Sequence, residues 1–376
     1  MSDQTLNQLY LEHCGKVSDK WSLYLTEYER IFADYRNKPI GLLEIGIQNG
    51  GSLEIWAKYF KKAKFFVGCD INPDCTKLMY DDPNIRIIHG NSTAPAVLEK
   101  IIECSEKFDI IIDDGSHKSS DIIKSFALYF PILEEGGIFI VEDIHCSYWD
   151  IFEGGLFDPF SSISFFKLLI DILNYEHWGI PLDKTDILKY FFPKYEINIL
   201  NDTLALVHSI EFVNSMCIIR KNQLSKNGLG HRVISGSLEQ VVSGYRELNG
   251  SLYRLDLLEK ELGVNLFNHR ELDGDCYHLE QIFEKVSNLF LDRPQNSRET
   301  HHKNKTALEF YSSISQQAIS TLTKKIIERD KEINHLKQTI SAYEDSFSWL
   351  ITKPIRFISR YIKRIFRGSW KTLKLL

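Results

Sequence analysis

The chain has 376 residues, of which 43% are hydrophobic, so it is long enough to bury one sizeable core and carry an appendage. Its formal net charge is −6, but residues 353–376 contain eight Lys or Arg and no acidic residue, which leaves −14 on the rest. That acidic body argues against nucleic acid as a partner, and seven scattered cysteines without a CxxC pair argue against a zinc site or disulfide framework.

The first 221 residues alternate between helical patterns and short apolar runs that are typical of buried parallel strands. Residues 5–37 are predicted to be helical, and the helix between the fourth and fifth strands is expected to end at Pro131 and Gly136-Gly137. The predicted strands are residues 40–47, 64–69, 85–89, 110–112 and 138–141, with 203–208 and 212–219 closing the sheet. The alternation predicts an α/β domain over residues 1–221 with a doubly wound, mostly parallel sheet.

The first predicted strand runs into an acidic turn with two glycines, Glu44-Ile-Gly46-Ile-Gln-Asn-Gly50. Gly46 would permit a tight turn, and Gly50 would let a cofactor approach the start of the next helix. Asp70 ends the second strand and is placed to bind both hydroxyls of a ribose. The acidic Glu44 would repel a pyrophosphate, which favours S-adenosylmethionine over NAD. The predicted cofactor-binding residues are Glu44, Gly46, Gly50, Asp70, Asn91 and Asp113. Alternatively, Glu44 and Asp70 only cap strand ends.

Two acidic pairs, Asp113-Asp114 and Glu142-Asp143, follow the fourth and fifth predicted strands. Because the carboxyl ends of parallel strands meet at one edge of a sheet, we expect these carboxylates to converge there with His117. Oxygen ligands from a few carboxylates suit Mg²⁺, so Asp114, Glu142 and Asp143 are the predicted metal ligands. Open coordination positions on such an ion could chelate adjacent hydroxyls of a sugar.

His117 lies three residues after Asp114 and is predicted to accept the proton of that hydroxyl. The alternative for His117 is a helix cap or a surface residue, and His145 is the competing base. Tyr148 and Trp149 are predicted to stack on the substrate, together with contacts from His145.

Six stretches within residues 18–149 resemble the class I S-adenosylmethionine methyltransferases that O-methylate deoxysugars, the mycinamicin and macrocin family. They are SDKW, LYLTEYERIFADYRNKP, LLEIGIQNGGSLEIWAKYF, GCDINP, FDIIIDDGSH and GGIFIVEDIHCSYW. The resemblance implies Mg²⁺ ligands at Asp114, Glu142 and Asp143, the base at His117, and cofactor contacts from Glu44 and Asp70. Gln48 departs from the commoner loop of such enzymes, which has glycine there.

Beyond residue 221 the pattern changes to a helical region and polar linker over residues 222–306. Residues 307–352 are predicted to form a coiled coil, because apolar residues hold a and d positions from Ile319 to Leu350. Residues 353–376 are predicted to form a basic amphipathic helix on an anionic membrane surface. The alternatives are a lone helix packed on the body and a basic helix docked on its acidic surface.

The tail sequence SFSWLITKPIRFI resembles the endings of bacterial polysaccharide-assembly proteins. With no signal-peptide pattern evident and thiols expected to be reduced, we expect a cytoplasmic protein, peripheral on the inner face of the cell membrane. The predicted partners are a glycan or a nucleotide- or lipid-linked sugar acceptor, that membrane surface, and a second copy or a glycan-assembly protein through the coiled coil.

Together these features predict Mg²⁺-dependent transfer of a methyl group from S-adenosylmethionine to a sugar hydroxyl of a cell-surface polysaccharide or its lipid-linked precursor. Two alternatives stay open. One is a nicotinamide-dependent sugar oxidoreductase, and the other is a non-catalytic scaffold for glycan assembly at the membrane.

Overall fold

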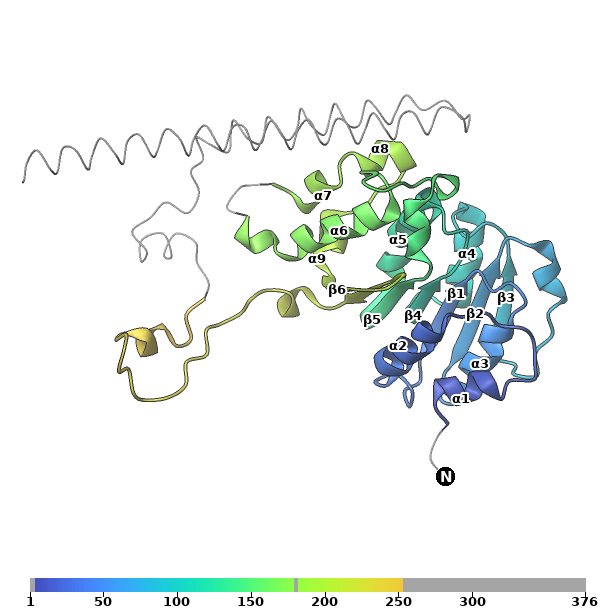
Figure 1. The fold of residues 1–376 in the computed structure, drawn as a ribbon, viewed down its shortest axis with the longest axis horizontal. Coiled ribbons are helices and arrows are strands. Elements are labelled where there is room, and N and C mark those ends of the chain that lie inside the picture. The colour runs from blue at the N-terminus through green and yellow to red at the C-terminus, as the bar shows by residue number, and fades with distance from the viewer. Residues whose placement is uncertain (1–3, 179–181, 253–376) are drawn as a thin grey trace, which may run out of the picture. The chain divides into compact units, whose positions relative to one another are not determined.

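A seven-stranded sheet forms the centre of the computed structural model, which describes residues 4–178 and 182–252 (Figure 1). The strands are β1 Gly41–Ile45, β2 Phe65–Asp70, β3 Ile85–His89, β4 Phe108–Asp113, β5 Leu133–Val141, β6 Val207–Val213 and β7 Met216–Lys221. Their order is β3-β2-β1-β4-β5-β7-β6, in which β1 to β5 are parallel and β7 is antiparallel to both neighbours. This is the predicted doubly wound, mostly parallel sheet.

The register of the parallel strands brings the predicted site residues to one edge of the sheet. Ile45 in β1 pairs with Cys69 in β2 and Asp113 in β4, and Asp113 pairs with Val141 in β5. The residues that follow these positions, among them Asp70, Asp114 and Glu142, therefore lie together at the carboxyl edge of the sheet. This is the edge at which open α/β sheets bind ligands.

Helices cover both faces of the sheet. They are α1 Leu6–Leu11, α2 Ser22–Phe32, α3 Gly51–Tyr59, α4 Pro95–Cys104, α5 Ser119–Tyr129, α6 Ser162–Leu173, α7 Lys184–Ile187, α8 Phe191–Tyr195 and α9 Asn201–Ala205. Figure 1 shows α1, α2 and α3 on one side of the sheet and α5 and α6 on the other. The glycine loop after β1 leads directly into the first turn of α3, with Gly50 just before the helix. The start of α3 therefore lies at the same edge of the sheet.

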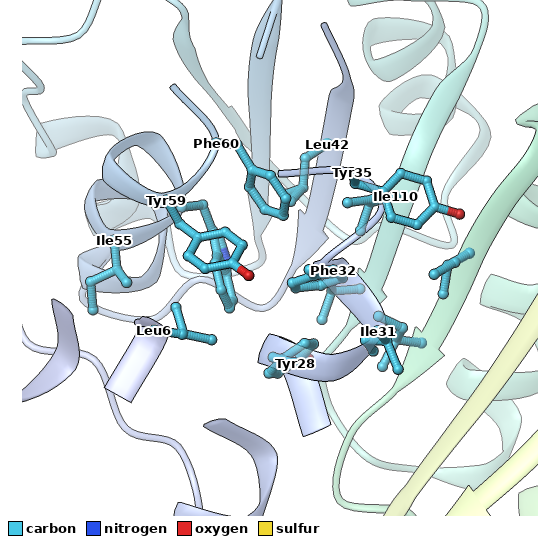
Figure 2. Packing of buried hydrophobic residues seen from close by; sticks show 14 of the residues in the cluster. Leu6, Tyr28, Ile31, Phe32, Tyr35, Leu42, Ile55, Tyr59, Phe60 and Ile110 are labelled. Carbon is cyan, nitrogen blue, oxygen red and sulfur yellow. The ribbon is translucent and has the colours of Figure 1, made fainter. Parts of the chain in front are cut away.

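Aromatic packing fixes α2 on the sheet. Tyr28 and Phe32 lie one helical turn apart, and both side chains are fully buried. Their rings stack with centroids 4.8 Å apart, and Phe32 meets Trp56 of α3 edge to face at 5.6 Å. Figure 2 shows Tyr28 and Phe32 in the cluster that also contains Tyr59 of α3 and Leu42 of β1. Each such pair adds about 0.5–1.5 kcal/mol beyond area burial, so the C-terminal half of α2 is packed firmly against α3.

Several predicted boundaries are wrong. Residues 5–37 form two helices, α1 and α2, separated by the non-helical segment 12–21. Residues 203–208 do not form a strand, because residues 201–205 are α9 and β6 begins at Val207. Residues 212–219 are the hairpin of β6 and β7, with its turn at Asn214 and Ser215. The Gly136-Gly137 pair lies inside β5 instead of ending α5, which ends at Tyr129.

Residues 222–252 contain two short 3₁₀ turns, Leu224–Lys226 and Tyr245–Leu248, so the helical prediction is wrong for this stretch. The rest of that region, the coiled coil over 307–352 and the basic helix over 353–376 lie outside the described residues. Among the residues that the structure describes, none of the helices combines the length and hydrophobicity needed to cross a bilayer.

Lys221, at the end of β7, stabilises the connection between α5 and β5. Its Nζ donates hydrogen bonds to the carbonyl oxygens of Phe130 (3.1 Å), Pro131 (2.9 Å) and Leu133 (2.7 Å), and the residue is only 4% exposed. Lys221→Met would leave these buried carbonyls without that donor and should lower the free energy of unfolding by about 2–4 kcal/mol.

Chemical denaturation measures this effect. The exposed Lys226 is the matched control, and Lys226→Met should change the free energy of unfolding by less than about 0.5 kcal/mol. Equal values for the two variants would contradict the stabilising role of Lys221.

Candidate functional site

A cavity of about 450 Å³ lies at the carboxyl ends of β1, β2 and β4, within the size range of small-molecule sites. Its lining comes from five places along the chain. They are residues 17–20, the loop 45–49 with Ser52, residues 69–72, residues 90–92, and the acidic loop 113–117 with Asp121 and Asp143. Six aspartates and one lysine line it, so the cavity is strongly acidic.

The turn after β1 requires glycine at Gly46. Its φ is +84°, and a Cβ there would lie 2.1 Å from the carbonyl oxygen of Asp114. The Gly46 backbone can therefore pack directly on the loop that carries the candidate metal ligands. Gly50, with φ +78°, precedes the first turn of α3, but unlike Gly46 it is not among the residues that line the cavity.

Asp70 holds the glycine turn in place. Its Oδ2 accepts hydrogen bonds from the backbone N–H of Ile47 (3.0 Å) and Gln48 (2.8 Å), and its Oδ1 accepts one from Asn72 (2.8 Å). Asp70 and Asn91 both line the cavity as predicted for cofactor residues. Contact between Asp70 and a ribose stays a prediction. The structure shows in addition that the Asp70 carboxylate holds the backbone of the glycine turn.

Asp113, at the end of β4, lies against the same cavity. Burial raises the pKa of its carboxyl group to about 7, although the backbone N–H of Gly115 bonds to Oδ1. Its buried Oδ2 has no hydrogen-bond partner among the described residues. A buried polar atom beside a cavity is suited to a polar group of a bound ligand.

Lys20 is the site residue to which sequence reasoning gave no role. Its buried Nζ lies 2.5 Å from Asp114 Oδ2, 2.7 Å from Glu142 Oε1 and 3.7 Å from Glu44 Oε1. Burial acts to lower the pKa of Lys20, but the carboxylates of Glu142 and Asp114 outweigh it and raise that pKa well above its usual value. The motif SDKW contains this lysine, which was the available signal.

The two predicted glutamates are deeply buried. Glu44 is fully buried in β1 under the glycine turn, where Ser52 Oγ donates to its Oε2 (2.6 Å), and it does not line the cavity. Glu142 is 2% exposed, and its Oε1 accepts hydrogen bonds from Lys20 and from the hydroxyl of Tyr28 (2.5 Å). Oε1 of Glu142 thus already has two hydrogen-bond partners within the protein.

Asp114, His117 and Asp143 bring three potential ligand atoms within 4.8 Å of one another. Two carboxylates that leave room for water and substrate are a common Mg²⁺ donor set, so Asp114 and Asp143 fit this ion, with Glu142 beside them. Asp143 Oδ1 accepts from Trp21 Nε1 (3.0 Å) and the Tyr24 hydroxyl (2.8 Å), which fixes its orientation.

His117 and Asp143 both have left-handed backbones, with φ of +58° and +51°. Such non-glycine conformations cost about 1–3 kcal/mol each and concentrate at functional sites. They bring His117 Nε2 to 3.8 Å from Asp143 Oδ2, which places the imidazole beside the candidate cation site.

The loop after β5 carries the predicted substrate contacts. His145 Nδ1 bonds to Ser215 Oγ and lies 3.8 Å from Asp143 Oδ1. The ring of Trp149 meets the ring of His145 edge to face at 4.9 Å, and Tyr148 and Trp149 are 42% and 49% exposed. His145 lies beside Asp143 and Trp149 packs on His145, and none of His145, Tyr148 and Trp149 lines the cavity. The exposed rings of Tyr148 and Trp149 leave aromatic surface for an acceptor.

Part of the chain is similar to known O-methyltransferases. Residues 23–149 match the family model described as Rhamnosyl O-methyltransferase/CmcI. The chain is 34% identical over 183 residues to 8-demethyl-8-alpha-L-rhamnosyl tetracenomycin-C 2'-O-methyltransferase of Streptomyces olivaceus, covering 45% of this chain and 47% of that protein. It is 34% identical over 201 residues to Mycinamicin VI 2''-O-methyltransferase of Micromonospora griseorubida, covering 50% and 47%.

The chain thus spans about half the length of the curated relatives it matches. Among solved structures it is similar to the MycE methyltransferase from the mycinamycin biosynthetic pathway in complex with Mg and SAH. That likeness has 25% identity and a TM-score of 0.49, and it covers 66% of this chain and 59% of the other.

Proposed function

We propose that this protein transfers a methyl group from S-adenosylmethionine to a sugar hydroxyl, assisted by Mg²⁺. The observation that carries the proposal is one cavity lined by both the glycine turn and the acidic loop. Gly46 and Asp70 lie on it together with Asp114, His117 and Asp143. A methyl donor and a cation-bound hydroxyl could therefore meet in this cavity. The sugar O-methyltransferases among the relatives support the reaction class.

The charge of the cavity supports S-adenosylmethionine as the cofactor. Six aspartates and one lysine line it, and so negative a surface attracts the positive sulfonium of that cofactor and repels a pyrophosphate. This favours a methyl donor over a nicotinamide dinucleotide. Asp70, Asn91 and Asp113 supply polar groups on the wall of the same cavity.

The proposed reaction is an in-line displacement. The hydroxyl oxygen of the sugar forms a bond to the methyl carbon as the carbon–sulfur bond breaks, which yields a methyl ether and S-adenosylhomocysteine. Asp114, Glu142 and Asp143 would hold a divalent cation, which makes a coordinated hydroxyl more acidic. His117 accepts the hydroxyl proton, and its Nε2 lies 3.8 Å from Asp143 Oδ2, beside the candidate cation site.

The proposed acceptor is a cell-surface polysaccharide or its lipid-linked precursor. Trp149 and Tyr148 are about half exposed in the loop that follows Asp143, and such exposed aromatic rings suit stacking on a sugar ring. The sequence of the tail supports a membrane-associated glycan and a partner bound through the coiled coil; both ideas rest on residues outside those described. We propose that the protein acts on the cytoplasmic membrane face.

Mass spectrometry of surface glycan tests the acceptor. Glycan from cells that lack the protein should lose the mass of one CH₂ for each missing methyl group, and the wild-type gene should restore it. A gene for the Asp114→Asn variant is the matched control and should not restore the mass. Identical glycan masses with and without the protein would overturn the proposed acceptor.

A further inference from the structure

Lys20 occupies the centre of a buried group of carboxylates that come from three neighbouring strands. Its side chain is 2% exposed, and the ammonium group faces Glu44 of β1, Asp114 after β4 and Glu142 after β5. Glu44 and Glu142 are buried and Asp114 is partly buried, so the three carboxylates would repel one another without a cation between them. The ammonium of Lys20 offsets part of this repulsion and links the three carboxylates in one arrangement.

The contacts of Lys20 engage one oxygen of each of two candidate ligands, Asp114 and Glu142. Its Nζ bonds to Oδ2 of Asp114 and to Oε1 of Glu142, and the Tyr28 hydroxyl bonds to that same Oε1. The other oxygen of each carboxylate is left to a bound cation. Hydrogen bonds of this kind orient the ligands of metal ions and tune their affinity.

The segment 16–21 holds Lys20 in place from both sides. On one side, Val17 O accepts a hydrogen bond from Gly51 N at the start of α3 (3.2 Å). On the other side, Trp21 Nε1 donates to Asp143 Oδ1 (3.0 Å). Lys20 thus lies in a fixed stretch of backbone between the helix after the glycine turn and the candidate cation ligands.

We propose that Lys20 is a positioning residue for the divalent cation, acting through Asp114 and Glu142. This inference rests on the cation site of the proposed function. Replacement of groups that hold metal ligands typically weakens metal binding by about 10–100-fold. We expect a loss of that size when the ammonium of Lys20 is removed.

Mn²⁺ binding to the full chain, followed by the electron paramagnetic resonance signal of the free ion, tests this without a turnover assay. Lys20→Met should bind Mn²⁺ about 10–100-fold more weakly than wild type, and Lys20→Arg, which keeps the charge, should recover much of the affinity. The matched control is Lys16→Met, because Lys16 lies in the same segment but pairs with Glu54 of α3. Its Mn²⁺ affinity should equal that of wild type.

Unchanged Mn²⁺ affinity in folded Lys20→Met would overturn the inference and leave the proposed function standing. If Lys20→Met does not fold, the double variant Lys20→Met/Glu44→Gln removes one buried charge of each sign. Weak Mn²⁺ binding by the folded double variant supports the inference, and wild-type binding contradicts it. Failure of the wild-type chain itself to bind Mn²⁺ would overturn both the inference and the cation site of the proposed function.

Discussion

Replacing Asp114 by Asn is expected to lower the rate of methyl transfer by about 10³-fold, because the change removes a charged oxygen from the candidate cation site. Loss of a few kcal/mol of transition-state stabilisation corresponds to a factor of this size. Asp114 also faces Lys20 at 2.5 Å, so the Asn variant leaves the ammonium with less negative charge beside it. Steady-state rates at saturating Mg²⁺ measure the effect.

Asp121→Asn is the matched control. Asp121 lines the same cavity, but its Oδ2 accepts a hydrogen bond from Ser116 Oγ (2.5 Å), and it is not part of the group formed by Asp114, His117 and Asp143. This variant should keep most of the activity. Equal losses in Asp114→Asn and Asp121→Asn would indicate a general effect of cavity charge and contradict a specific cation ligand.

His117→Ala is expected to lower kcat by about 10²–10⁴-fold, the usual contribution of a positioned general base. The affinity for S-adenosylhomocysteine should stay near that of wild type, because Asp70, Asn91 and the glycine turn are untouched. His145→Ala is the comparison. Both imidazoles lie 3.8 Å from a carboxylate oxygen of Asp143, but His145 is bonded to Ser215 and lies outside the cavity lining.

Near-normal kcat in His117→Ala, with a large loss in His145→Ala, would move the role of base to His145. Rapid-quench measurement of a single turnover separates this chemical step from product release. A smaller loss of kcat in His145→Ala than in His117→Ala supports the assignment.

The strand ends could be predicted because their signal is local. A buried parallel strand needs a continuous apolar run, and the polar residue that follows it marks the edge where ligands bind. Asp70, Asp113 and Asp114 were found in this way. In the sheet, Cys69 of β2 and Asp113 of β4 both pair with Ile45 of β1, so the residues that follow them, Asp70 and Asp114, lie at one level.

The role of Lys20 could not be predicted, because it arises from tertiary packing. The apolar spacing of residues 5–37 suggested a continuous helix, in which a lysine usually faces solvent. The break at residues 12–21 instead turns Lys20 inward between three carboxylates. The sequence predicts both Glu44 and Asp114 as site residues, but only Asp114 lines the cavity.

The closing strands were misplaced for a related reason. Residues 201–205 form α9, and its buried Leu204 faces the core as a strand residue would. Helix or strand is ambiguous for an apolar run this short. The turn at Asn214 and Ser215 lies within a run that is otherwise apolar, so the pattern predicts one strand over residues 212–219, which hold the end of β6 and most of β7.

Methyl transfer with purified protein tests the central claim most directly. The full chain is incubated with S-adenosylmethionine that carries a deuterated methyl group, Mg²⁺, and glycan isolated from cells that lack the protein. We expect mass spectrometry to find the labelled methyl on a sugar oxygen, and we expect EDTA or the Asp114→Asn change to abolish the signal. Label transfer that persists in EDTA, or unlabelled glycan together with binding of NAD(H) and not of S-adenosylhomocysteine, would contradict the account.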